Sequence, residues 1–189
     1  MNALTSLGPA APLADWDRAQ IDLHLWLGRC LDCFTQAESV VSASLLLMAR
    51  QSSVCVELGK AYLFGQKLQI LRNGLQALEA TDPKRARLAI HSLDRFQPYA
   101  DLRNSVCHGA STLYLDKDGH WLVELKLTQL SATAIVTSQV FIDQAAAAEK
   151  LKGLKSAVQS LGARLSNLSA VLSLPDVATP SAPAAQASR

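Results

Sequence analysis

The residue types best suited to chemistry lie in one short segment, residues 102–109, which reads Leu-Arg-Asn-Ser-Val-Cys-His-Gly. Arg103 carries a planar guanidinium whose donors match phosphate oxygens, and His108 carries an imidazole that transfers protons near neutral pH. Asn104 adds an amide that can hydrogen-bond the imidazole. These three side chains predict acid–base chemistry on a phosphodiester without a metal ion.

The segment is expected in the last turns of a short helix that begins at Pro98. Gly109 is expected to end this helix in a left-handed conformation. At about 100° per helical residue, Asn104 and His108 lie roughly 40° apart on one face, and Arg103 must use its length to join them. We therefore predict that all three are catalytic, although a histidine at a helix end can also serve only to contact carbonyls and the helix dipole.

Three amphipathic helices are predicted before this segment, over residues 15–50, 52–78 and 82–96. A serine can cap the second helix, and the pair Asp82 and Pro83 opens the third. The first helix is expected to bury an apolar stripe with alternating steps of three and four, formed by Leu23, Leu27, Cys30, Phe34, Ala37, Val41, Leu45 and Met48.

A small β structure and a final helix are predicted after the segment. Residues 112–115 and 121–127 flank Asp-Lys-Asp-Gly, which indicates a hairpin with a glycine-containing turn, and residues 134–142 can add a third strand. Asp143 caps a last helix, whose apolar seam we expect to pack on the other helices of the chain, a two-chain coiled coil being the alternative. The seam consists of Leu151, Leu154, Val158, Leu161, Leu165, Leu168 and Leu172.

The expected fold class is mainly α: an antiparallel bundle of four to five helices with a small β-hairpin or β-sheet insertion before the last helix. We expect one domain over residues 15–174, because 189 residues with 49% hydrophobic content can bury a single core. Residues 1–14 and 175–189, rich in alanine and proline, are expected to be disordered tails.

Composition narrows the class of protein. The formal net charge is +2 and 18% of the residues are charged, so any surface for nucleic acid must be local. The first residues do not read as a secretion leader, and no apolar stretch is long enough to span a bilayer. We therefore expect a soluble, cytoplasmic protein with no membrane partner.

The third predicted helix is locally basic, with Lys84, Arg85, Arg87 and Arg95. These side chains can form a rim along which RNA lies next to Arg103, or simply a solvated face. We assign them as candidate RNA-binding residues.

Four cysteines, Cys30, Cys33, Cys55 and Cys107, are expected to be reduced core and boundary residues. Cys30 and Cys33 form a Cys-x-x-Cys pair, but the sequence has no second pair and no nearby histidine at metal-ligand spacing. A zinc or redox site at this pair is the alternative. We expect no metal and no cofactor.

The segment around Arg103 resembles the motif of the HEPN superfamily, which consists of arginine, four to six residues, and histidine near the end of the last-but-one bundle helix. The gap here is four residues, Asn104 matches the polar residue that often follows the arginine, and Gly109 is also typical after the histidine. The resemblance covers residues 15–174 in helix order and only these few positions in motif detail.

This resemblance implies a helical bundle that pairs two protomers so that both motifs face one cleft, commonly cutting RNA without a metal. Carried over, Arg103 would bind the scissile phosphate, His108 would be the acid–base group and Asn104 would support the histidine. Many members act in toxin–antitoxin or anti-phage systems, which implies an antitoxin or nucleotidyltransferase partner.

The sequence thus favours a homodimeric, metal-independent endoribonuclease with a toxin or defence role. A non-catalytic HEPN-like module that binds a partner protein or a nucleotide is the second hypothesis. An unrelated helical interaction protein is the third, and it gains support if Arg103 and His108 point away from any cleft.

Overall fold

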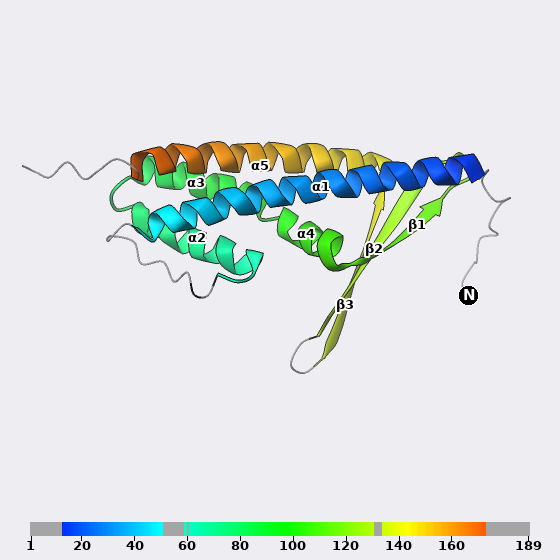
Figure 1. The fold of residues 1–189 in the computed structure, drawn as a ribbon, viewed down its shortest axis with the longest axis horizontal. Helices are drawn as coiled ribbons and strands as arrows, with labels where there is room; N and C mark the ends of the chain where they lie inside the picture. Colours follow the sequence, from blue (N-terminus) through cyan, green and yellow to red (C-terminus); the bar gives the residue numbers. More distant parts are fainter. Residues whose placement is uncertain (1–12, 51–58, 60, 131–133, 173–189) are drawn as a thin grey trace, which may run out of the picture.

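The computed structural model describes residues 13–50, 59, 61–130 and 134–172. Within these ranges the chain forms five helices and one three-stranded antiparallel sheet (Figure 1). The helices are α1 (Leu13–Met48), α2 (Phe64–Leu78), α3 (Pro83–Phe96), α4 (Tyr99–His108) and α5 (Gln144–Leu172). The strands are β1 (Ala110–Leu115), β2 (Trp121–Leu130) and β3 (Ile135–Asp143). A mainly helical fold with a small β insertion before the last helix is therefore confirmed.

The predicted tails, residues 1–14 and 175–189, lie outside the described residues, except that residues 13 and 14 open α1. All other described elements lie within the predicted domain of residues 15–174. Among the described helices, none combines the length and the apolar character needed to cross a membrane.

The long helices α1 and α5 lie side by side and form the axis of the molecule (Figure 1). The predicted stripe of α1 is buried, apart from Leu27, which packs against the core at its edge. The predicted seam of α5 is buried from Leu151 to Leu168, against α1 and α3 of the same chain. The seam therefore packs within the bundle, as expected for an amphipathic helix whose apolar stripe must be covered.

Helix α2 begins later than predicted. The predicted start at residue 52 or 53 lies outside the described residues, whereas Ala61, expected inside the helix, precedes it. The helix begins at Phe64 because Leu63 is extended and its N–H donates to Gln66 Oε1 at 3.0 Å, which satisfies one of the backbone donors that a helix start leaves free. The spacing of the apolar residues did not predict that the helix begins only at Phe64.

Two predicted caps form as expected. Asp82 Oδ1 accepts from the N–H of Arg85 at 3.2 Å, and Pro83 occupies the first helical position of α3. Asp143 Oδ1 accepts from the N–H of Ala146 at 2.7 Å at the start of α5. Both helix starts were therefore encoded locally.

Helix α4 ends at Gly109 as predicted, but for a different reason. Gly109 is extended, with φ of −82° and ψ of 152°, so the predicted left-handed cap is wrong. Its N–H donates to Ser105 O at 3.0 Å, and a Cβ built on Gly109 would clash with that same carbonyl and press on Lys126 O of β2. Glycine is needed here for close approach of backbones, which lets the chain pass directly from α4 into β1.

The sheet has the order β1-β2-β3, with both pairs antiparallel. The predicted turn forms between β1 and β2, and Gly119 takes a φ of 80° there, which glycine adopts without strain. Alternate side chains of β2, including Val123 and Leu125, are buried. The outer parts of β2 and β3 project away from the helices (Figure 1), where Ile135 and Val136 are exposed.

Candidate functional site

The structure brings Arg103 and His108 into direct contact at the end of α4. Arg103 Nη1 lies 3.1 Å from His108 Nε2, although the two residues are five positions apart on the helix. Arg103 spans this separation with its long side chain, as the sequence predicted. Its side chain is half-buried, whereas His108 is exposed at the last helical residue. The pair thus forms a compact cation–imidazole unit that is open to solvent.

Asn104 joins this unit through the guanidinium and not through the imidazole. Arg103 Nη1 donates to Asn104 Oδ1 at 3.3 Å, and no hydrogen bond links Asn104 to His108. The predicted contact between the amide and the imidazole is therefore replaced. The amide acts on the orientation of Arg103, which in turn contacts His108.

The guanidinium is also held by an aromatic ring from α2. Arg103 Cζ lies 5.7 Å from the centroid of Phe64, within the range of a cation–π contact. Phe64 itself is buried and packs edge-on against Phe96, with ring centroids 5.9 Å apart. The buried ring of Phe64, at the start of α2, therefore supports the guanidinium of Arg103.

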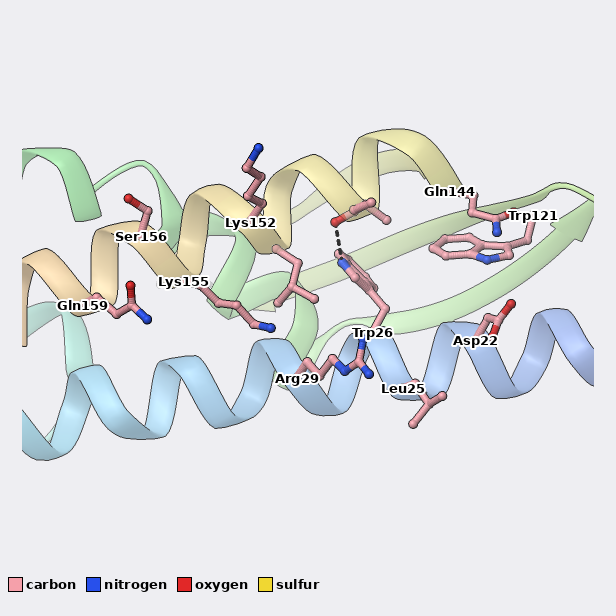
Figure 2. Close-up of a pocket in the computed structure, with 13 residues that line it drawn as sticks. Asp22, Leu25, Trp26, Arg29, Trp121, Gln144, Lys152, Lys155, Ser156 and Gln159 are labelled. Atoms are coloured by element: carbon pink, nitrogen blue, oxygen red, sulfur yellow. Dashed lines mark hydrogen bonds between the residues drawn. The ribbon is translucent and has the colours of Figure 1, made fainter.

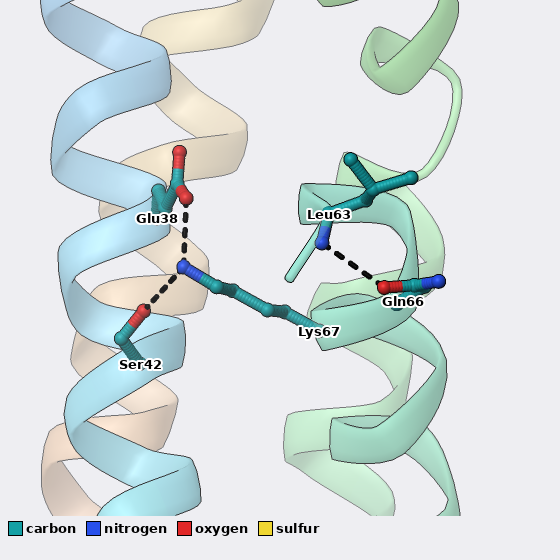
Figure 3. A network of polar contacts seen from close by, with 5 residues as sticks. All are labelled: Glu38, Ser42, Leu63, Gln66 and Lys67. Carbon is teal, nitrogen blue, oxygen red and sulfur yellow. Dashed lines mark hydrogen bonds and ion pairs between the residues drawn. The ribbon is translucent and has the colours of Figure 1, made fainter. Parts of the chain in front are cut away.

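A second polar network lies between α1 and α2 (Figure 3). Lys67 of α2 reaches α1, where its Nζ pairs with Glu38 Oε1 at 2.8 Å and donates to Ser42 Oγ at 3.3 Å. Burial raises the pKa of the Cys107 thiol; Arg103 opposes this increase and Glu38 reinforces it. Both charges therefore act on the thiol of the residue that precedes His108.

Sequence reasoning did not single out Phe64, Glu38 or Lys67. Phe64 is recognisable in the sequence as the aromatic residue that begins the apolar stripe of α2. Its contact with Arg103 is not, because the two residues lie 39 positions apart in the chain. Glu38 and Lys67 lie on ordinary amphipathic helices, and their pairing depends on how α1 and α2 pack. No local signal marks either residue as part of a site.

The four candidate RNA-binding residues are not gathered around Arg103. Lys84 and Arg85 lie at the start of α3, where they line a hollow of about 530 Å³ with Arg164 of α5. Arg85 pairs there with Asp82 at 2.6 Å. Since a helix of this length spans about 20 Å, this hollow lies at the other end of α3 from α4.

The other two candidates lie further along α3. Arg87 is exposed and lies 3.7 Å from Glu79, and Arg95 lies in the last turn, where the chain approaches α4. Of the four, Arg95 alone comes from the end of α3 that leads into the Arg103 site. RNA binding by these residues stays a prediction.

The cysteines of the Cys-x-x-Cys pair belong to the core. Cys30 is fully buried and Cys33 is 5% exposed. The pKa of the Cys30 thiol is raised to about 12, mainly by burial and also by Cys33, while Lys155 opposes the increase. A thiol that resists ionisation is a poor metal ligand and a poor nucleophile, so the predicted core role is confirmed for both residues. Cys55 lies outside the described residues.

One group of donors in the described part of the chain has the spacing of a cation site. Asp116, Asp118 and His120 lie in the turn between β1 and β2, with one ligand atom from each within 4.8 Å of the others. Asp116 Oδ1 already accepts from the N–H groups of Asp118 and His120 at 2.9 and 2.8 Å, and all three side chains are exposed. These hydrogen bonds explain the cluster as part of the turn.

In comparisons with known proteins, the chain matches no family model, no curated protein and no solved structure. Inference about its function therefore depends on the chemistry of its own side chains.

Proposed function

We propose that this protein is a HEPN-like, metal-independent endoribonuclease in which Arg103 binds the scissile phosphate and His108 is the acid–base group. The observation that carries the proposal is the 3.1 Å contact between Arg103 Nη1 and His108 Nε2. It places a phosphate-binding cation and a proton acceptor within reach of one phosphodiester. The resemblance of the motif extends the proposal to a toxin or anti-phage defence role.

In the proposed mechanism the base is Nε2 of His108, and the contact with Arg103 supports this choice. A guanidinium has donors only, so Nε2 of His108 must accept, and the neutral ring carries its proton on Nδ1. The lone pair of Nε2 therefore faces the guanidinium. A phosphate that binds Arg103 draws the guanidinium away from Nε2, and the neighbouring ribose hydroxyl takes its place at this lone pair.

Arg103 retains donors for the substrate. Its Nη1 serves His108 and Asn104, whereas Nε and Nη2 have no hydrogen-bond partner among the described residues. These remaining N–H groups can bind two phosphate oxygens side by side. Phe64 beneath the guanidinium limits its rotation, which preserves this geometry when RNA binds.

The proposed reaction is a transfer within the RNA chain. His108 Nε2 takes the proton of the 2′-hydroxyl, the 2′-oxygen forms a bond to phosphorus, and the bond from phosphorus to the 5′-oxygen breaks. The imidazolium then returns the proton to the departing 5′-oxygen, which leaves a 2′,3′-cyclic phosphate on one product. Arg103 stabilises the charge that grows on the phosphate oxygens.

We also propose that the enzyme is a homodimer in which two copies of α4 face one RNA strand. One arginine and one histidine are few groups for a polyanionic substrate, and His108 is exposed, which leaves it free to act across an interface. Mixing Arg103→Ala chains with His108→Ala chains tests whether the working arginine and histidine come from different protomers, because only such a composite site regains partial activity in the mixture. A sedimenting monomer with full activity at micromolar concentration would refute it.

The test of the activity compares wild-type protein with His108→Ala on a short RNA and on the same strand made of DNA. We expect wild-type protein to cut RNA in the presence of a chelator and to leave DNA intact, because the nucleophile is the 2′-hydroxyl. His108→Ala should be inactive with an unchanged thermal melt. His91→Ala serves as the matched control, since His91 is exposed on α3 and outside the site.

The outcomes separate the hypotheses. Full cleavage by His108→Ala would overturn the mechanism. Wild-type protein that binds RNA without cutting it would instead favour a non-catalytic binding module, with Arg103 as its phosphate contact.

A further inference from the structure

A second pocket lies on another part of the molecule, between the first halves of α1 and α5. It encloses about 630 Å³, which is the size of a small-molecule site, and Trp121 at the start of β2 closes one end (Figure 2). None of its lining residues belongs to the Arg103 site. We call it the α1–α5 hollow.

Two tryptophans form the apolar wall of the hollow. Trp26 of α1 donates from Nε1 to Ala147 O of α5 at 2.8 Å, which ties the two helices together beside the cavity. The rings of Trp26 and Trp121 lie 6.3 Å apart at an angle of 50°. Both residues are buried and packed, so the wall is preformed.

Cationic side chains from both helices line the same cavity. Arg29 comes from α1, Lys152 and Lys155 come from α5, and Asp22 is the only carboxylate of the lining. Figure 2 shows Lys155 extending toward α1, on the side of Arg29. In the part of the chain that the structure describes, none of these three cations has an ion-pair partner. The hollow therefore has an excess of positive charge without internal neutralisation.

One buried donor of the lining is also unmatched. Trp121 is 4% exposed, and its Nε1 has no hydrogen-bond partner among the described residues. In Figure 2 this nitrogen lies on the edge of the ring that faces α1, toward Asp22. Buried donors are nearly always paired in folded proteins, so this nitrogen is a donor for an acceptor that reaches it when the side chains around it shift.

We propose that the α1–α5 hollow binds a small aromatic organic anion. The anionic group lies between Arg29 and Lys155, the rings lie against Trp26 and Trp121, and an acceptor atom of the ligand pairs with Trp121 Nε1. The apolar wall and the cations from two helices together select this class over neutral aromatics and over simple inorganic anions. This site is separate from the proposed nuclease site, so either proposal can fail without the other.

The test uses anilinonaphthalene sulfonate as the anionic probe and N-phenylnaphthylamine, which has the same rings without the sulfonate, as the neutral one. We expect saturable binding of the sulfonate at one site per chain. In the indole N–H region of the NMR spectrum, the signals of Trp26 and Trp121 should shift. The signal of Trp16, which is 41% exposed and outside the hollow, should not.

Charge variants then locate the anionic group. Arg29→Gln with Lys155→Gln should weaken sulfonate binding by about tenfold or more and leave binding of the neutral probe unchanged. Lys117→Gln with Lys150→Gln is the matched control, because both lysines are exposed and neither lines the hollow. Equal sulfonate affinity in the two double variants, or a shift of the Trp16 signal alone, would overturn the proposal.

Discussion

The Arg103 site and the α1–α5 hollow both place cations beside aromatic rings, but they differ in how the polar groups are paired. Arg103 donates to His108 and Asn104 within its own helix and lies over Phe64. Its main contacts are therefore made before any substrate arrives. Such a preorganised cation suits the stabilisation of charge in a reaction.

The hollow has the opposite character. Arg29 and Lys155 come from different helices, and neither has an ion-pair partner in the described ranges. Trp121 contributes a buried N–H that also has no partner among the residues that the structure describes. In the proposal above, these groups gain their partners from the ligand. Our two proposals thus assign reaction to the region whose polar groups are paired within the protein, and capture of a ligand to the region whose groups are unpaired.

The largest expected effect tests the first region. Arg103→Lys should lower RNA cleavage by about 10²-fold, because an ammonium keeps the charge but loses the planar pair of donors and the contact with His108. Arg29→Gln, in the hollow, should leave cleavage unchanged. Initial rates on a short RNA measure both. If both variants lost RNA cleavage equally, the two regions would not have separate functions.

The next effect concerns the backbone that holds the Arg103 site. Gly109→Ala should lower the free energy of unfolding by about 1–3 kcal/mol, because its Cβ would clash with Ser105 O. Cleavage should fall as well, since His108 is the neighbouring residue. Gly28→Ala is the control, because a Cβ at Gly28 meets no atom within 4 Å. Chemical denaturation and cleavage rates measure the two effects.

The third effect is a pH dependence of the core beneath both regions, at Cys30. Burial raises the pKa of Cys30 from 9.0 to about 12, so the unfolded thiol ionises first as pH rises. The stability contribution of the protonated thiol is therefore complete below pH 9.0 and is lost progressively toward pH 12. Denaturant unfolding of Cys30→Ala should show a weaker decline over this interval. If the unfolding free energy of the wild type and of Cys30→Ala fell equally over this interval, burial of the Cys30 thiol would not be the cause.

The smallest expected effect compares the two indole N–H groups. Trp26→Phe should cost about 1 kcal/mol more than Trp121→Phe in unfolding free energy, because only Trp26 loses a hydrogen bond, the one to Ala147 O. Both substitutions keep an aromatic ring in a buried place. Chemical denaturation of the two variants measures the difference. A larger cost at Trp121 would show that its N–H is already paired.

Much of the fold was predictable because its signals are local. The cap at Asp82, the cap at Asp143 and the turn at Gly119 each depend on a few neighbouring residues, and all three form. The apolar steps of α1 and α5 reveal which face each helix buries, since periodicity records burial directly. The contact of Arg103 with His108 also lies within one helix and followed from the reach of the side chain.

Other features required the packed molecule. Gly109 is extended because Lys126 O of β2 approaches it, and no pattern in α4 announces that strand. Arg103, which donates to Asn104, also contacts Phe64 from a separate helix, and no local pattern predicts that contact. Residue types therefore identified the motif, but neighbours from other elements decided how its members are arranged.

The sequence by itself determined the helices, their buried faces and the segment that holds Arg103 and His108, since backbone hydrogen bonding and apolar periodicity act over a few residues. Only the tertiary structure decided that Lys84 and Arg85 lie far from that segment and that α1 and α5 enclose a hollow. Such placements depend on the packing of whole elements against one another. The spacing of residues within one helix or strand does not predict this packing.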